Sequence, residues 1–361
     1  MRFISVCCGI FLALALRATL AGQAVGPQPT KVASASKVPA HTEKKVAREP
    51  TGPPAKELFS AVKMPAAEAA RSIGFYAKGC LAGAKALPID GAAWQVMRLS
   101  RNRNWGHPNL IALIEKLAMK ARAHDGWPGL LVGDISQPRG GPMPSGHASH
   151  QIGLDADIWL TPMPEERLSV QQREALSAIS MLADDKVSVD PHVWTDAHVR
   201  VIKRAASYPI VERIFVHPAI KKALCEVAAP DSERSWLHKV RAYWGHDDHF
   251  HLRIACPAGS PCRAQPQLSS DDGCGKELSR WLALVAPKPP APKPAKPARP
   301  QPPKPEITLD QLPAECRAVL KEAPGGLALP EAAAKPTGTR EKAAKTLAPA
   351  KTPPEVRPTP Q

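Results

Sequence analysis

The spacing of apolar residues predicts a chain that mixes helices with strands. In residues 108–124 the apolar positions recur every three or four residues, which indicates an amphipathic helix that ends at Asp125-Gly126. Residues 154–160 and 249–255 instead alternate apolar with polar, which is typical of half-buried strands. Both kinds of element therefore contribute to one core.

Weaker patterns extend this assignment. Further helices are predicted over 55–76, 170–184 and 195–207, with Thr195 as the cap of the third, and another helix begins at Pro218. Residues 130–135 and 211–216 are predicted strands, and residues 309–320 return to the body. The elements do not alternate regularly, so the pattern favours an α+β fold over a doubly wound one.

The two alternating strands each have a polar face. Successive strand residues point to opposite sides, so His249 and His251 share one face of the second strand. In the first strand, Asp155, Asp157 and Trp159 lie opposite the apolar residues. His150 has the wrong parity for a continuous strand with Asp157, but Gly153 offers a bend.

Five of the 12 histidines fall in two compact clusters beside aspartates. The clusters span residues 147–157 and 246–251, and they supply the imidazoles and carboxylates that zinc prefers. Three such ligands and a water make an open, catalytic zinc site. A lone His-x-His pair would be weak evidence, but the two clusters together predict a metal site.

Proline divides the 361 residues. The 41 prolines concentrate before residue 55, in 287–305 and in the C-terminal tail, and the remainder suffices for one sizeable core. We predict a signal peptide over 1–21, a Pro/Lys-rich linker over 22–54, a folded domain over 55–325 with a Pro/Lys-rich insert at 286–305, and a disordered basic tail over 326–361.

The signal peptide is predicted from the first residues. Arg2 precedes an apolar run over 4–16, Arg17 ends the run, and small residues around Ala21 and Ala24 offer cleavage sites. The run is too short to span a membrane, and no transmembrane segment is predicted in the mature chain. These features predict an exported, periplasmic protein.

The net charge of +15 lies mostly outside the predicted core. Residues 22–54 carry +3, residues 286–305 carry +5, residues 326–361 carry +3 and the signal carries +2, which leaves about +2 for the core. Basic residues interleaved with aromatics are absent, so nucleic acid is not a predicted partner. The basic segments are solvated extensions or attract anionic envelope polymers.

Six cysteines remain after the two in the signal peptide: Cys80, Cys225, Cys256, Cys262, Cys274 and Cys316. An even number in an exported chain predicts disulfides, and fifteen pairings are possible. A cysteine-rich zinc site is disfavoured, because the mature chain has no Cys-x2-Cys.

Three motifs carry a family resemblance. They are SRNRNWGH at 100–107, GDISQPRGGPMPSGHASHQIGLDADIW at 133–159 and YWGHDDHFHLR at 243–253. In this order they resemble the penicillin-insensitive murein endopeptidase family, which is related to lysostaphin-type and D-Ala-D-Ala metallopeptidases and to the hedgehog signalling domain. The resemblance covers roughly residues 55–325.

The resemblance implies a small antiparallel sheet that carries Zn²⁺ among packed helices. It implies His150, Asp157 and His251 as ligands, His249 as the catalytic histidine, and His147 and His246 lining the site, with His147 a possible auxiliary ligand. It also implies the disulfides Cys80–Cys316, Cys225–Cys274 and Cys256–Cys262. The implied substrate is peptidoglycan, cleaved at the D-alanyl-diaminopimelate cross-link.

We further expect His249 to act as general base or oxyanion stabiliser with help from His246, and the division of roles stays open. Arg139, Trp105 and His107 are candidates to line the substrate groove, and ordinary packing is the alternative for each.

Two other functions compete with this one. A serine-type penicillin-binding protein needs three motifs, and Ser60-x-x-Lys63 and Ser100-x-Asn102 match two of them, but the third is missing. A zinc-bearing module that binds the cell wall without catalysis is the second alternative. A histidine at 249 that is not a ligand favours catalysis over binding alone.

Overall fold

The computed structural model describes residues 52–228, 233–288 and 306–325. Its helices are α1 (Ala55–Ala61), α2 (Pro108–His124), α3 (Val170–Ala175), α4 (Asp196–Ser207), α5 (Pro218–Val227), α6 (Lys276–Val285) and α7 (Glu315–Lys321), with the 3-10 helices η1 (Leu99–Arg101), η2 (Ser235–Lys239) and η3 (Leu309–Gln311). Its strands are β1 (Arg71–Phe75), β2 (Lys78–Ala82), β3 (Lys85–Ala86), β4 (Trp94–Val96), β5 (Trp105–Gly106), β6 (Leu130–Val132), β7 (Asp155–Trp159), β8 (Val211–Val216), β9 (Val240–Ala242) and β10 (His249–Ile254).

The main sheet has six strands in the order β4-β6-β7-β10-β8-β9. Its four central strands are antiparallel, but β4 runs parallel to β6 and β9 runs parallel to β8. The α+β class is therefore confirmed, whereas the expectation of an antiparallel sheet holds only at the centre. The two edge strands join by connections that include helices or long loops, and such connections permit parallel pairing.

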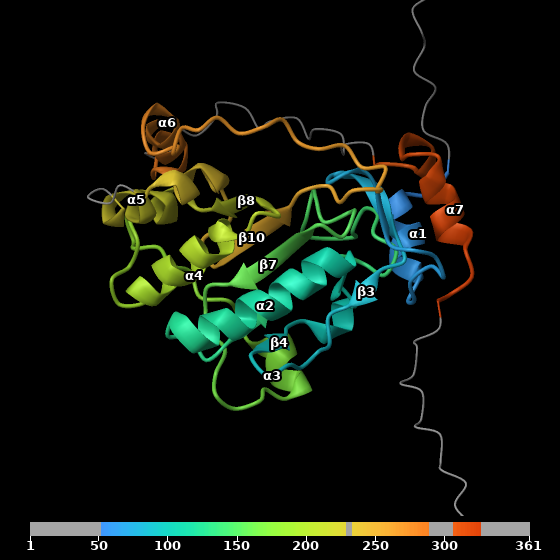
Figure 1. The fold of residues 1–361 in the computed structure, drawn as a ribbon, viewed down its shortest axis with the longest axis horizontal. Helices are drawn as coiled ribbons and strands as arrows, with labels where there is room; N and C mark the ends of the chain where they lie inside the picture. The colour runs from blue at the N-terminus through green and yellow to red at the C-terminus, as the bar shows by residue number, and fades with distance from the viewer. Residues whose placement is uncertain (1–51, 229–232, 289–305, 326–361) are drawn as a thin grey trace, which may run out of the picture. The chain divides into compact units, whose positions relative to one another are not determined.

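One face of the central strands forms the main core. Ala156 and Ile158 of β7 and Phe250 and Leu252 of β10 are fully buried in one apolar cluster with α2 and α4. Figure 1 shows both helices lying across this face of the sheet. The predicted alternation of apolar and polar faces is confirmed, which leaves the opposite face for polar residues. Both strands are almost wholly buried, however, rather than half-buried.

Two predicted helices are confirmed with their capping. Helix α2 begins at Pro108, after His107 accepts a hydrogen bond from the Asn109 amide, and it ends at His124. Helix α4 has Thr195 as its N-cap, and the Thr195 and His198 side chains form a capping box. The predicted strand at 211–216 and the helix that begins at Pro218 are also present.

Two other predicted helices are shorter than expected. The helix predicted over 55–76 ends at Ala61, because Pro65 disfavours a helical backbone just before it, and β1 follows. The helix predicted over 170–184 ends at Ala175. Beyond it, the Met181 amide donates to the Asp247 carbonyl and Ser180 donates to the Asp247 carboxylate, so tertiary contacts replace the helical ladder.

A second, smaller core lies beside α1, α7 and the β1–β2 hairpin, which Figure 1 shows at one end of the molecule. The Cys80–Cys316 disulfide joins β2 to α7 inside it. Cys225–Cys274 and Cys256–Cys262 are also bonded. All three pairings implied by the family resemblance are confirmed.

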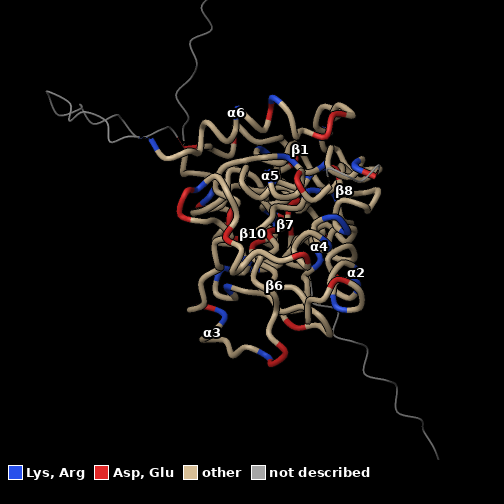
Figure 2. The backbone as a smooth tube through the Cα atoms, turned by 90° about the vertical axis from the view of Figure 1, so that its left-hand side faces the viewer, with Lys and Arg blue, Asp and Glu red and all other residues tan. Residues whose placement is uncertain are grey.

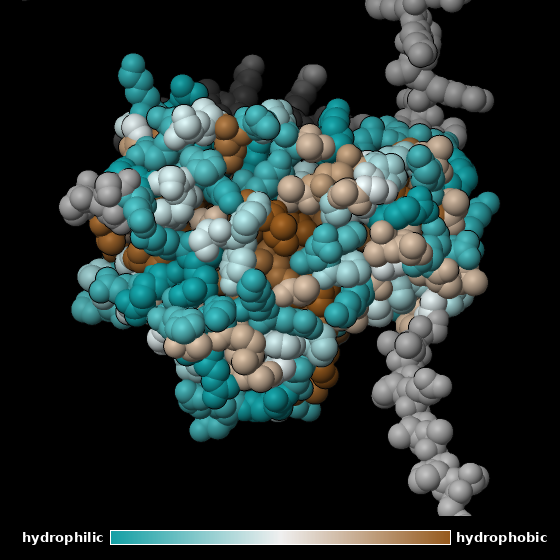
Figure 3. Space-filling view, in the orientation of Figure 1, coloured by the Kyte–Doolittle hydropathy of each residue, from teal (hydrophilic) through white to brown (hydrophobic). Residues whose placement is uncertain are grey.

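The surface in the view of Figure 3 is mostly hydrophilic, with a hydrophobic area near its middle. Within the described residues, no helix has the length and apolar character needed to cross a membrane. The signal peptide, almost all of the linker, most of the insert and the tail lie outside the described residues. The predicted domain limits stay predictions.

Candidate metal centre

The pairing of β7 with β10 brings the two sequence clusters together. Asp157 lies directly opposite His251 in the antiparallel register, and Asp155 lies opposite Arg253. All four are on the face away from the main core. Figure 2 shows acidic residues beside β7 and β10 in the interior of the molecule. Asp157 and His251, which are 94 positions apart in sequence, thus become neighbours.

His150 reaches the same place through a turn before β7. Its φ of 67° is left-handed and is followed by a φ of 68° at Gly153. The His150 amide donates to Asp155 Oδ2 at 3.0 Å, which holds the turn against the strand. The predicted bend at Gly153 is therefore present, and it corrects the parity of His150.

Three donor atoms from these residues face one another at the centre. His150 Nε2 lies 3.2 Å from His251 Nδ1, and Asp157 Oδ1 lies 3.3 Å from each of them. Asp157 Oδ1 is buried and accepts no hydrogen bond. A buried carboxylate oxygen without a hydrogen bond is costly unless a cation meets it, so this trio fits a metal ion.

The other nitrogen of each imidazole has its own partner. His150 Nδ1 donates to the Ile135 carbonyl at 2.7 Å. His251 Nε2 donates to Asp155 Oδ1 at 2.9 Å. Protonation at these nitrogens leaves His150 Nε2 and His251 Nδ1 as lone pairs that point at Asp157. A metal-ligating histidine typically has such a partner, which fixes its tautomer and orientation.

Asp155 is held in turn by Arg253. The Arg253 Nε donates to Asp155 Oδ1 at 2.6 Å, and its guanidinium lies over the Tyr76 ring at 4.0 Å. Burial raises the pKa of Asp155, but Arg253 and His251 outweigh it and hold the pKa below its ordinary value. Asp155 is thus an anion that keeps His251 in the required tautomer.

His147 sits between two carboxylates. Its Nε2 lies 3.0 Å from Asp134 Oδ2 and 3.4 Å from Asp157 Oδ2. Donor atoms of His147, His150 and Asp157 all lie within 4.8 Å of one another, so this set also fits a metal. Burial raises the pKa of Asp134, but His147 and Arg103 outweigh burial and lower the pKa to about 2. Asp134 therefore competes with a metal for His147.

His249 and His246 flank the trio on its open side. His249 Nε2 lies 3.7 Å from Asp157 Oδ1, and its Nδ1 donates to Asp248 at 2.6 Å. Burial lowers the pKa of His249, but Asp157 and Asp248 reverse this and raise it to about 9. Burial lowers the pKa of His246 to about 4, helped by His251 and His249. The two imidazoles thus favour opposite charge states.

Burial also affects Asp157 itself. Burial raises its pKa, and the neighbouring imidazoles of His150, His249 and His147 overcome this and hold it well below the ordinary value. Asp157 is therefore ionised at neutral pH. A carboxylate anion beside two neutral imidazole lone pairs is a donor set that zinc binds.

The three predicted groove residues lie elsewhere or are buried. Arg139 donates to the carbonyls of Met64, Val319, Leu320 and Glu322, which favours a role in holding the C-terminal segment. Trp105 donates to Asn102 Oδ1 at 2.8 Å, and His107 caps α2. All three are at most 7 % exposed, so the packing alternative is favoured for each.

The sequence reasoning did not assign roles to Asp134, Asp155, Asp248 or Arg253. The signal for two of them was available, because Asp155 and Arg253 share the polar face of their strands with Asp157 and His251 at a spacing of two. The predicted site residues His147, His150, Asp157, His246, His249 and His251 are all brought together by the structure. Their individual roles stay predictions.

Fold and site together define an α+β protein with a candidate metal centre that stays open on one side. The model of the penicillin-insensitive murein endopeptidase family matches residues 72–321. A penicillin-insensitive murein endopeptidase from Haemophilus influenzae is 48 % identical over 225 residues, which cover 61 % of this chain and 75 % of the relative. One from Pectobacterium atrosepticum is 41 % identical over 267 residues, 74 % of this chain and 89 % of the relative.

The chain therefore belongs to the penicillin-insensitive murein endopeptidase family. It is a peptidase.

Proposed function

We propose that this chain is a zinc-dependent endopeptidase that hydrolyses peptide cross-links of peptidoglycan in the periplasm. The observation that carries the metal assignment is Asp157 Oδ1, which is buried without a hydrogen bond and lies 3.3 Å from His150 Nε2 and His251 Nδ1. The substrate is supported by the relatives, which are named murein endopeptidases.

His150, Asp157 and His251 are the proposed ligands. Zinc held by these three side chains would supply Lewis-acid polarisation of a scissile carbonyl and a water of lowered pKa. His147 is the proposed auxiliary residue, because Asp134 holds its Nε2 at hydrogen-bond distance. Arg101 and Arg103 hold Asp134 in turn, at 3.0 and 2.7 Å.

His249 is the proposed acid–base residue. Its side chain is 19 % exposed, and Asp248 fixes its Nδ1, so its Nε2 remains on the open side of the trio to take or give a proton. His246 donates its Nδ1 proton to the Trp244 carbonyl at 2.9 Å, which leaves its Nε2 as an acceptor. His246 and His249 are therefore the proposed pair that shares the roles of general base and oxyanion stabiliser.

The proposed bond is the one between D-alanine and diaminopimelate. A single assay tests the class of chemistry: cleavage of purified cross-linked wall fragments, read by mass spectrometry, with a zinc chelator, with a penicillin and with Ser60→Ala. We expect the chelator to stop cleavage and the other two treatments to leave it unchanged, because penicillin needs an activated serine.

The opposite pattern, loss with penicillin or Ser60→Ala and none with the chelator, would refute the metallopeptidase proposal. Ser60 donates to the Glu57 carbonyl on α1, so it is not activated by a base there. Binding of the fragments without any cleavage by the metal-loaded protein would instead favour a non-catalytic wall-binding module.

A further inference from the structure

Three aromatic rings form a surface beside the histidines, which we name the aromatic platform: Tyr243, Trp244 and Trp281. Tyr243 and Trp244 follow β9, and Trp281 lies on α6. Trp244 is 64 % exposed and Tyr243 is 40 % exposed. Folding does not account for a tryptophan left this open, and exposed aromatic surface beside a site is typical of ligand contact.

The platform is fixed by the loop that positions His246. The Tyr243 amide donates to the Val216 carbonyl at 2.9 Å, and the Trp244 carbonyl accepts from His246 Nδ1 at 2.9 Å. The His217 amide donates to the His246 carbonyl at 2.8 Å. Gly245 supplies the turn with a φ of 71°. Trp244 is therefore exposed on an anchored loop.

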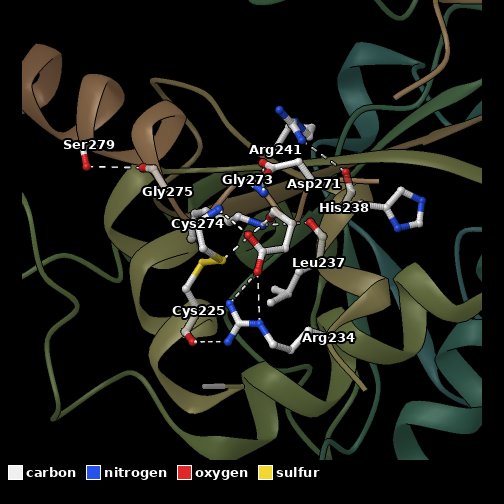
Figure 4. Close-up of a disulfide and its surroundings, with 12 residues drawn as sticks. Cys225, Arg234, Leu237, His238, Arg241, Asp271, Gly273, Cys274, Gly275 and Ser279 are labelled. Carbon is white, nitrogen blue, oxygen red and sulfur yellow. Dashed lines mark hydrogen bonds and ion pairs between the residues drawn. A yellow bond between two sulfur atoms is a disulfide. The ribbon is translucent and has the colours of Figure 1, made fainter. Parts of the chain in front are cut away.

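Helix α6 supports the platform from behind. The Trp281 ring lies 5.5 Å from the Tyr243 ring, and α6 packs with Cys225 and Ala242 in a small apolar cluster. Figure 4 shows the Cys225–Cys274 disulfide, which ties the start of this segment to α5, with Arg234 beside it. Arg241 of β9 also pairs with Glu277 of α6. The support is thus covalent as well as apolar.

The platform is continuous with the candidate metal centre. The ring of His246 lies 5.8 Å from that of His251, and the Tyr243 ring lies 5.6 Å from that of His246. The Trp244 ring stacks on Tyr243 at 5.9 Å with an interplanar angle of 24°. Trp244 is therefore three ring-to-ring contacts from a proposed metal ligand.

We propose that the aromatic platform binds a sugar ring of the glycan strand while the attached peptide occupies the metal centre, an inference that rests on the proposed function. The rings of the platform are flat and carry no formal charge. One face of a pyranose carries C–H groups whose partial positive charge matches the negative face of an aromatic ring. The peptides of peptidoglycan carry carboxylates, which such a surface does not attract.

The test compares two substrates of the metal-loaded, full-length enzyme: cross-linked muropeptides that carry their disaccharides, and the same peptides after enzymatic removal of the sugars. We expect wild type to show a KM about tenfold lower for the sugar-bearing substrate. Trp244→Ala should abolish this difference at nearly constant kcat, because stacking far from the reacting atoms contributes equally to ground and transition states. Trp244→Phe should retain part of it.

Met119→Ala is the matched control, since Met119 is 47 % exposed on α2 and lies outside the platform and the metal centre. It should keep the tenfold difference. Equal KM values for the two substrates in wild type, or a Trp244→Ala effect of the same size on both, would overturn the inference and leave the proposed function intact. Cleavage of neither substrate by wild type would refute the proposed function and, with it, the inference.

Discussion

Two regions of this molecule bury charge, and they differ in whether that charge is satisfied within the protein. At the metal centre, Asp157 Oδ1 is buried without a hydrogen bond. At the junction of α5 with the segment before α6, the buried Lys221 Nζ donates to the Leu237 carbonyl at 2.8 Å and to the Asp272 carbonyl at 2.6 Å. Arg234 pairs there with the Asp272 carboxylate at 2.6 Å.

The difference separates a binding site from a structural network. A buried polar group that has partners contributes to a defined fold, whereas one without a partner indicates a ligand or ion that completes it. Substitutions at the metal centre should therefore remove activity and spare folding, and substitutions at the α5–α6 junction should do the reverse.

The largest effect is expected at the metal centre. His251→Ala removes one of the three donor atoms and should lower the cleavage rate at least about 1,000-fold, which corresponds to about 4 kcal/mol. The free energy of unfolding of the metal-free protein should change little, because Asp155, the hydrogen-bond partner of His251, stays paired with Arg253. Cleavage assays and urea unfolding of the same preparation measure both. A rate within tenfold of wild type would remove His251 from the site.

Removing the disulfide at the junction should have the opposite effect: a loss of stability with little loss of cleavage rate. Replacing Cys225 and Cys274 by serine should lower the free energy of unfolding by about 2–4 kcal/mol, because the cross-link restricts the unfolded chain. Cleavage of sugar-free peptides by the folded variant should stay within about threefold of wild type. Urea unfolding supplies the measurement, and a rate loss as large as that of His251→Ala would erase the distinction between the regions.

All six cysteines of the mature chain are paired. Thiol titration of the denatured, unreduced wild type should therefore find no free cysteine.

A smaller catalytic effect separates the proposed acid–base residue from the ligands. His249→Ala should lower the rate about 100-fold and retain the metal, since it removes a proton donor or acceptor and not a ligand. Rate and metal content are measured on one sample. Loss of the metal together with the rate would make His249 a ligand, and a near-normal rate would show that it is not catalytic.

The last expected effect is a pH dependence of stability at the junction. Burial lowers the pKa of Lys221 from 10.5 to about 7, and Arg241 adds to this. Between pH 7 and about 10 the unfolded chain binds the proton that native Lys221 has released, so the free energy of unfolding rises with pH in this window. The penalty for burying the charge is fully present below pH 7.

Lys221→Met is the matched comparison, because it keeps the length of the side chain and removes the titration. The stability of wild type relative to this variant, measured by urea unfolding at pH 6, 8 and 9.5, should increase with pH. A constant difference across these three pH values contradicts the assignment.

Periodicity in the sequence predicted the site better than it predicted the whole fold. The alternation of 154–160 and 249–255 placed Asp157 and His251 on polar strand faces, and the structure pairs them directly. Both strands lie in the middle of the sheet, where one face must pack on α2 and α4, so the pattern determines the orientation.

The failures occur where distant contacts override local pattern. Residues 176–184 have a helical pattern, yet Met181 and Ser180 bond to Asp247, which is 66 residues or more away in sequence. The parallel pairing of β9 with β8 also depends on tertiary packing, which local pattern does not encode. For Arg139 the sequence left a substrate role and ordinary packing open, and the four carbonyls that it contacts, from segments far apart in sequence, favour packing.

The zinc content of the purified protein tests the central claim most directly. Elemental analysis after dialysis against metal-free buffer should find one zinc per chain in wild type and none in Asp157→Ala, with circular dichroism showing that both are folded. His249→Ala should match wild type. Full zinc content in folded Asp157→Ala, or a metal-free wild type that still cleaves cross-links, would contradict the account.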